Sequence, residues 1–326
     1  MRRLIKILVV VAVLGVVLMV GILGWLFLAY PLVSPAPAIT VAATPEVLER
    51  GEYVFNHVAA CAHCHSAPDY EAYAMPPQPG SIGQGGWGFG GEVGVPGLVY
   101  ASNITPHALA TWSDGEILRA LSSGVSKDGR ALFPLMPWRH YATTSRADLE
   151  AVIAHVRTLP AVVNEVPAPR LSFPMNVIAR TLPVDAQLAS SAPDRADELA
   201  YGRYLVDLGA CADCHSPTEH GEPIAGLEFA GGREFVFADG SIVRSMNITP
   251  DQATGLGTWT REQFIGRFQA WGGRREKLAP GQPNTPMPWT SYGGMTAEDL
   301  GAIFAYLRSL PPVANVVVKT SPAPAR

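Results

Sequence analysis

Charge is scarce in this chain of 326 residues, because Asp, Glu, Lys and Arg together make up 16% of it, against a typical share of about 25%. The shortage excludes an intrinsically disordered chain and a nucleic-acid-binding protein, since both depend on a high density of charge. Four cysteines are too few for a disulfide scaffold of this length. Residues 1–30 contain no acid and carry Arg2, Arg3 and Lys6, so the formal charge of −4 divides into +3 there and −7 in the remainder. A basic end followed by an acidic body predicts a membrane anchor and an exported domain.

The anchor is predicted from one long apolar run. Ile7 to Tyr30 contains no charge and no Asn, Gln or Ser, and a helix of that length spans about 36 Å, which is enough to cross the hydrocarbon core. The basic residues before it leave the N-terminus in the cytoplasm and the body on the periplasmic side of the inner membrane. A cleaved signal peptide is the alternative, with Ala36-Pro37-Ala38 as the cleavage site. The run exceeds a signal peptide's apolar core of about 7–15 residues, so we expect residues 1–30 to be a retained single-pass anchor.

Six short segments occur twice in the same order, 144–151 residues apart. They are Gly51-Glu-Tyr53 and Gly202-Arg-Tyr204, Cys61 to His65 and Cys211 to His215, Asn103 to Pro106 and Asn247 to Pro250, Thr111-Trp112 and Thr258-Trp259, Met136 to Trp138 and Met287 to Trp289, and Leu159-Pro160 and Leu310-Pro311. This repeat predicts two duplicated domains over 45–160 and 195–312. A Pro- and Ala-rich linker, 161–194, is expected to pack across both, and 313–326 is expected to be a loose tail.

Each unit is predicted to be helical, which makes the fold class all-α. Helices are expected over 46–60 and 195–210, each leading into a cysteine pair. Capping boxes, Ser113 with Glu116 and Thr260 with Gln263, predict a helix start after each repeated Trp. The last helix of each unit has an amphipathic pattern and ends at Leu-Pro. The Gly-rich stretch 81–91 is expected to be an irregular loop, since no strand precedes it and no helix follows.

The two Cys-x-x-Cys-His motifs carry the chemistry. Two thiols three positions apart can bond to the two vinyl groups of one haem, and the next residue then presents an imidazole to the iron. A thioredoxin-like redox pair needs a βαβ setting, a zinc site would need pairs closer together, and disulfides leave the twin histidines unexplained. The motifs therefore predict two covalently bound haem c groups, attached through Cys61 and Cys64 and through Cys211 and Cys214, with His65 and His215 as iron ligands.

The second axial ligand follows by elimination in the second unit. His220 is the one further His after His215 and follows it too closely to reach the opposite haem face. The remaining soft ligands are Met246, Met287 and Met295, of which Met287 alone lies in a Pro-Met-Pro segment. Its twin, Met136, also precedes Pro-Trp, and both lie 71–72 residues after their histidine. Met136 and Met287 are therefore predicted to be axial haem ligands.

The motif order resembles tandem class I c-type cytochrome domains. More closely, it resembles the multihaem cytochrome c subunit of membrane-bound alcohol and gluconate dehydrogenases. The second unit carries the pattern as Cys211 to His215, Asn247 to Pro250, Trp259-Thr260, Met287 to Trp289 and Ser309 to Pro311. The chain departs from that family in having two haem motifs rather than three, and an N-terminal rather than a C-terminal membrane attachment.

The resemblance implies an electron-transfer protein without substrate chemistry of its own. Its donor would be a dehydrogenase catalytic subunit, and its acceptor the quinone pool, a bc-type complex or a terminal oxidase. A fixed subunit of an oxidase or bc-type complex is the alternative, and a dihaem peroxidase is disfavoured by the matched methionines. The basic cluster Arg274, Arg275 and Lys277 is interpreted as a solvated loop, with a docking patch for an acidic partner as the alternative.

Overall fold

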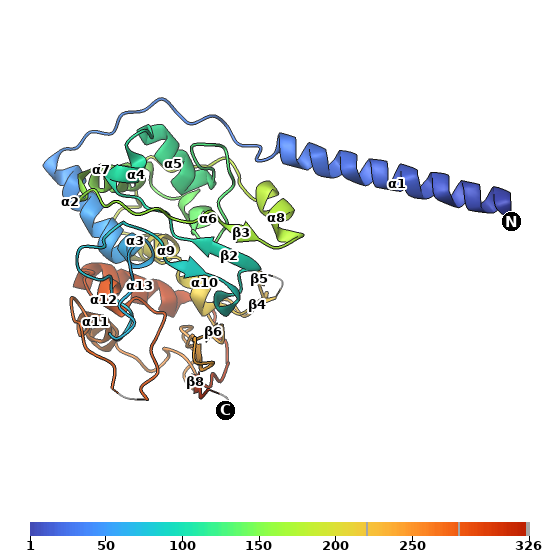
Figure 1. Ribbon diagram of the computed structural model, residues 1–326. Helices are drawn as coiled ribbons and strands as arrows, with labels where there is room; N and C mark the ends of the chain where they lie inside the picture. The colour runs from blue at the N-terminus through green and yellow to red at the C-terminus, as the bar shows by residue number, and fades with distance from the viewer. Residues whose placement is uncertain (220, 280, 324–326) are drawn as a thin grey trace.

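The computed structural model describes residues 1–219, 221–279 and 281–323. Its most extended element is α1 (Arg2–Ala29), which projects from the body as a single straight helix (Figure 1). An 18-residue stretch of this helix has a mean hydropathy of 3.1, and none of the helix residues is buried. Within the described residues it is the one helix long and apolar enough to cross a membrane, which agrees with the predicted anchor.

The body consists of two units whose main helices follow the same order, joined by a connecting region (Figure 1). The first unit contains α2 (Pro45–Tyr53), the π turn η1 (Val54–Val58), α3 (Cys61–Cys64), β1 (Gly88–Phe89), the 3₁₀ turn η2 (Gly91–Val93), β2 (Gly97–Tyr100), α4 (Pro106–Leu109), α5 (Asp114–Ser123), α6 (Trp138–Tyr141) and α7 (Arg146–Thr158). The connecting region contains β3 (Arg170–Leu171), α8 (Met175–Ile178) and the 3₁₀ turn η3 (Ala179–Thr181). The second unit contains α9 (Glu198–Leu208), α10 (Cys211–His215), β4 (Thr218–Glu219), β5 (Glu222–Pro223), β6 (Glu234–Val236), β7 (Ile242–Arg244), α11 (Arg261–Gln269), α12 (Trp289–Tyr292), α13 (Ala297–Ser309) and β8 (Thr320–Ser321).

Helices dominate, but the all-α prediction is incomplete because each unit also holds a small antiparallel sheet. Strands pair in the order β1-β2-β3, with β3 supplied by the connecting region, and in the order β6-β7-β8 in the second unit, where β4 also pairs with β5. The last strand of each three-stranded sheet lies beyond the Leu-Pro at which the predicted units end. The prediction of a loose tail over 313–326 is therefore wrong at Thr320–Ser321, since Thr320 pairs with Val243. The duplicated pattern reaches residue 171 in one unit and residue 321 in the other.

Within each unit, two helices cross at close range, and the crossing is the same in both units. A Cβ built on Gly51 of α2 would lie 2.0 Å from the Ala151 carbonyl oxygen of α7, and one built on Gly202 of α9 would lie 2.0 Å from that of Ala302 in α13. Ordinary contacts of a Cβ begin at 3.4 Å. Glycine is therefore required at these positions by the close approach of the helix backbones rather than by a turn.

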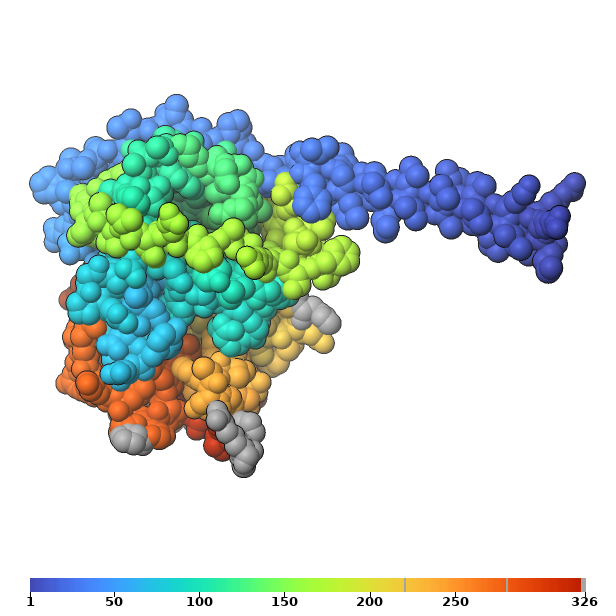
Figure 2. Space-filling model, in the orientation of Figure 1, coloured from blue at the N-terminus to red at the C-terminus, as the bar shows by residue number. Residues whose placement is uncertain are grey.

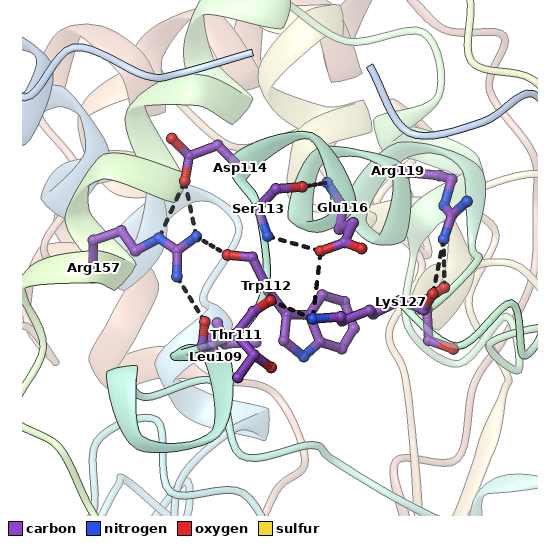
Figure 3. Close-up of polar contacts among 10 residues, drawn as sticks. Leu109, Thr111, Trp112, Ser113, Asp114, Glu116, Arg119, Lys127 and Arg157 are labelled. Carbon is purple, nitrogen blue, oxygen red and sulfur yellow. Dashed lines mark hydrogen bonds and ion pairs between the residues drawn. The ribbon is translucent and has the colours of Figure 1, made fainter. Parts of the chain in front are cut away.

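A helix cap and an arginine hold the loop before α5, and the same arrangement occurs in the second unit. The capping box of Ser113 and Glu116 forms as predicted, and the Arg157 guanidinium of α7 donates to the Leu109 and Trp112 carbonyls at 2.8 and 2.6 Å (Figure 3). Arg157 also pairs with Asp114 at 2.9 Å. In the second unit Thr260 and Gln263 form the same capping box, and Arg308 donates to the Leu256 and Gly257 carbonyls.

The two units share one hydrophobic core. Fully buried side chains of both, such as Phe55, Ile153, Leu205 and Leu300, belong to a single contiguous cluster. The units are thus packed against each other over their cores rather than joined by the linker alone.

Reciprocal polar contacts cross the same interface. Tyr53 of the first unit donates to Asp299 of the second at 2.8 Å, and its repeat partner Tyr204 donates to Asp148, the repeat partner of Asp299. Both carboxylates are buried and also accept from arginines, Asp148 from Arg50 and Asp299 from Arg195. Buried charges require such pairing, so these contacts fix the two units in one relative position.

The connecting region lies along the first unit rather than equally across both. β3 pairs with β2, and the Gln187 and Ala189 amides donate to the Ala142 and Thr144 carbonyls at 2.7 and 3.1 Å. Figure 2 shows this segment, in yellow-green, crossing the surface of the first unit towards the base of α1. Leu188 and Ala192, near the end of the region, pack against the shared core.

Candidate functional site

The cysteine pairs lie on two short helices with the same local backbone. Ala60 and Ala210, directly before Cys61 and Cys211, both adopt left-handed conformations, with φ of 48° and 49°. L-residues other than Gly, Asn and Asp rarely adopt this region, so its repetition marks a constrained turn. The turn starts α3 and α10, and one helical turn then places the two thiols of each pair near each other.

All four thiols are free, and their setting differs from that of a redox pair. Cys61 and Cys211 are half-buried against the shared core, while Cys64 and Cys214 are exposed. Burial raises the pKa of the Cys61 and Cys211 thiols to about 12, whereas redox-active thiols have a lowered pKa. Within the described residues no group of three or more His, Cys, Asp or Glu could hold a metal ion. The zinc and thioredoxin-like alternatives therefore find no support in this arrangement.

Each motif histidine is oriented by a backbone carbonyl. Nδ1 of His65 lies 2.8 Å from the Ser102 oxygen, and Nδ1 of His215 lies 2.8 Å from the Met246 oxygen. A carbonyl can only accept, so Nδ1 carries the proton and Nε2 keeps its lone pair. Burial lowers the pKa of both imidazoles, and the hydrogen bond to the carbonyl raises it by a smaller amount. The net lowering of the pKa favours the neutral form of each ring. A neutral imidazole with Nε2 free is the form that coordinates iron.

Two glycines that were not singled out from the sequence let the backbone at Ser102 and Met246, whose carbonyls bond Nδ1, approach the histidines. The amides of Gly85 and Gly231 donate to the His65 and His215 carbonyls at 2.8 and 2.7 Å. Both glycines have positive φ, and a Cβ on either would lie 2.4 Å from the backbone of Ser102 or Met246. Each is followed by a second Gly, and this Gly-Gly pair recurs at an offset of 146 residues. That recurrence is the signal from which the two positions could have been found.

Met136 and Met287 occupy equivalent loops. Each lies two residues before a short helix, α6 or α12, and each is partly buried. The other candidates are placed differently. Met246 is 39% exposed and offers its carbonyl to His215, and Met295 is 4% exposed within the shared core. His220 lies outside the described residues.

The loop that precedes Met287 is held by the first unit. The Asn284 side chain accepts from the Ala74 amide at 2.9 Å and donates to the Ala72 carbonyl at 3.1 Å. The Tyr73 ring packs on the Trp271 ring with centroids 4.5 Å apart. The second unit's methionine loop is therefore positioned across the interface rather than by its own unit alone.

The basic cluster belongs to this contact. Arg275 lies 3.7 Å from Asp69 and Lys277 lies 3.9 Å from Glu71, both acids of the first unit. Arg274 pairs with Glu276 at 3.1 Å. The cluster is thus solvent-exposed, as the favoured interpretation holds, but its charges are balanced locally.

The cysteine pairs of both units lie near one tyrosine, Tyr292. The Tyr292 hydroxyl donates to the Gly209 carbonyl at 3.1 Å. Burial and then the charges of all four thiols raise its pKa well above the ordinary value. The four thiols therefore lie within electrostatic range of one tyrosine, and the two candidate sites are neighbours.

Paired thiols, an adjacent histidine and a methionine loop are the features from which the sequence predicts a c-type cytochrome domain. Residues 199–311 match the sequence model of the family described as Cytochrome c.

The chain as a whole is similar to cytochrome subunits of several dehydrogenases. It is 29% identical over 300 residues to the cytochrome c subunit of the alcohol dehydrogenase (quinone) of Gluconacetobacter polyoxogenes, covering 86% of this chain and 60% of that protein. It is 27% identical over 282 residues to the gluconate 2-dehydrogenase cytochrome c subunit of Pantoea cypripedii, covering 82% and 60%. These relatives are therefore longer than the part that matches this chain.

A relative of matching length carries two haems by its name. The chain is 28% identical over 320 residues to a diheme cytochrome c-type protein of Cereibacter sphaeroides, covering 92% of this chain and 97% of that protein. This similarity agrees with the two motifs and with the absence of a third from the sequence.

Proposed function

We propose that the chain is a membrane-anchored dihaem cytochrome c that passes electrons from a dehydrogenase to the respiratory chain. The observation that carries the proposal is the repeated arrangement of a free thiol pair and a histidine whose Nδ1 is fixed by a backbone carbonyl. The arrangement occurs once in each unit, which supports two tandem cytochrome c domains, 45–160 and 195–312, as predicted.

The residues present fit a covalently held haem in each unit. Cys61 and Cys64 would form the two thioether bonds in the first, and Cys211 and Cys214 those in the second. His65 and His215 would each offer Nε2 to the iron, because Nδ1 is already engaged. When bound, each haem supplies an iron that alternates between the ferric and ferrous states. The protein's own contribution is to hold the ligands and to exclude water from them.

Met136 and Met287 are proposed as the opposite ligands. The structure favours Met287 over Met295, which is embedded in the core, and over Met246, whose carbonyl is on the histidine side. A thioether is a soft donor that stabilises ferrous iron and raises the potential. With Met136 and Met287 as ligands, neither iron would have an open coordination site, which supports a carrier rather than a peroxidase.

The location and partners follow from α1 and from the relatives. We propose that α1 anchors the chain in the inner membrane, with both units on the periplasmic side. The relatives named as dehydrogenase subunits support a dehydrogenase catalytic subunit as the donor. The acceptor is proposed to be the quinone pool, a bc-type complex or a terminal oxidase.

Replacing the methionines one at a time tests the ligand assignment. Imidazole stabilises ferric iron relative to a thioether, so Met136→His and Met287→His should each lower the potential of one haem and leave the other nearly unchanged. The near-infrared sulfur-to-iron band of the ferric protein should fall by about half in each variant, since each removes one of two thioethers. Redox titration and near-infrared absorption measure both effects.

Two other methionines provide matched controls. Met246→Leu and Met295→Leu should keep both bands and both potentials. Loss of the second unit's band in either control, with the band intact in Met287→His, would show that the assigned loop does not carry the ligand.

A further inference from the structure

Exposed apolar side chains gather where the body meets α1. In the connecting region, Phe173 is 72% exposed, Ile178 42% and Val184 50%. Leu32, just beyond α1, is 61% exposed. Residues 171–184 contain no acid and a single basic residue, Arg180. An uncharged surface with large exposed apolar side chains marks a contact with another molecule or with a membrane.

Arg180 ties this segment to the end of α1. Its guanidinium donates to the carbonyls of Phe27 and Tyr30 at 2.7 Å each, and it lies 5.1 Å from the centroid of the Phe27 ring. These carbonyls belong to the last helical turn and its cap, whose partial negative charge favours a cation. The one charge of the segment is therefore occupied by α1.

A second tie lies just beyond it. The Asp185 carboxylate accepts from the Ser34 amide at 2.7 Å and from its hydroxyl at 3.1 Å. Val177, Ala179 and Pro183 are buried and fix the segment to the body. The exposed apolar side chains are thus presented by a segment that is held on both sides of the α1 exit (Figure 1).

The length of α1 indicates how deep in the bilayer the contact between its C-terminal end and residues 171–184 lies. Its 28 residues span about 42 Å, which matches the whole bilayer with its headgroups rather than the hydrocarbon core of about 30 Å. Trp25 and Tyr30, whose rings meet edge to face at 5.6 Å, then lie in the interfacial zone favoured by such residues. Arg180, bonded to carbonyls at the same level, places its neighbours at headgroup depth.

We propose that residues 171–184 form an interfacial contact with the bilayer that α1 crosses, in which Phe173, Ile178 and Val184 enter the headgroup region. This inference rests on the membrane anchor proposed above. Burial of apolar side chains at the interface adds to the affinity of an anchor, and a second contact point also fixes orientation. The body is then held in one orientation on the membrane surface, rather than swinging on a tether.

Photocrosslinking of the full, haem-loaded chain tests the contact. Benzoylphenylalanine replaces Phe173 in one variant and Tyr70, which is 61% exposed on the first unit, in the control. Both variants are placed in vesicles of phosphatidylcholine and phosphatidylglycerol, collected by flotation, irradiated and analysed by mass spectrometry. We expect lipid adducts from position 173 and none from position 70. Adding Ile178→Asp and Val184→Asp should reduce the adduct at 173, because charge opposes entry into the interface.

The outcomes separate the contact from the anchor. If the protein floats with vesicles but position 173 gives no more lipid adduct than position 70, the interfacial contact is wrong and the anchor stands. A crosslink from 173 to a second copy of the chain would replace the lipid contact by self-association. Failure to float would overturn the anchor and this inference together.

Discussion

The close crossing of α2 and α7 predicts an unusual response to a Gly-to-Ala change. In an exposed helix, Ala is preferred over Gly by about 1 kcal/mol. At Gly51 the new Cβ would lie 2.0 Å from the Ala151 oxygen, so the helices must separate by 3.4 − 2.0 = 1.4 Å to restore an ordinary contact. The obstacle is backbone and cannot rotate away, so the overpacking cost of about 1–3 kcal/mol should be at or above its upper end. Gly51→Ala should therefore destabilise the protein by about 2 kcal/mol after the helix-propensity gain.

Thermal unfolding of the full chain in detergent, followed by circular dichroism, measures this effect. A loss of that size should lower Tm by about 4–8 °C, and Gly202→Ala should behave in the same way because its distance to Ala302 is also 2.0 Å. Gly266→Ala is the matched control, since Gly266 lies within α11 and a Cβ added there would meet nothing within 4 Å. It should leave Tm unchanged or raise it. Equal Tm values for Gly51→Ala and Gly266→Ala would refute the packing explanation.

Two further outcomes test the anchor and the contact between the units. Replacing residues 1–30 by a cleavable export signal should release a dihaem protein from membranes, because α1 is the one described helix able to span them; retention in high salt without other subunits would contradict this. Asn284→Ala removes the hydrogen bonds to Ala72 and Ala74, so on warming the near-infrared band of the second haem should fade before that of the first. Fading of both at one temperature would show that the first unit does not position the Met287 loop.

Features with a local or repeated signal could be predicted from the sequence. The capping boxes at Ser113 and Thr260 form as expected because the bonded residues are three apart. The final helices, α7 and α13, have the same length and begin with the same kind of hydroxyl cap in both units. The cysteine-histidine spacing likewise depends on a single helical turn, so the candidate site could be identified before the fold was known.

Features that depend on distant partners could not be predicted in this way. The strands β1, β3 and β8 are two residues long, too short to show an alternating pattern. β8 exists because it pairs with β7, nearly 80 residues earlier. The contact of Tyr53 with Asp299 joins residues 246 apart, and no local pattern predicts it. The repeat does indicate these positions, since both members of each Tyr-Asp pair recur at an offset of 151.

The proposed function depends above all on one covalently attached haem in each unit. Intact mass spectrometry of the exported chain measures this attachment, by comparison with Cys61→Ala/Cys64→Ala and Cys211→Ala/Cys214→Ala variants and with the haem retained after acid–acetone extraction. We expect the mass of two haems in the parent protein and of one haem in each variant. A parent protein with one haem or none, or haem lost entirely to the solvent, would contradict the assignment of the two sites.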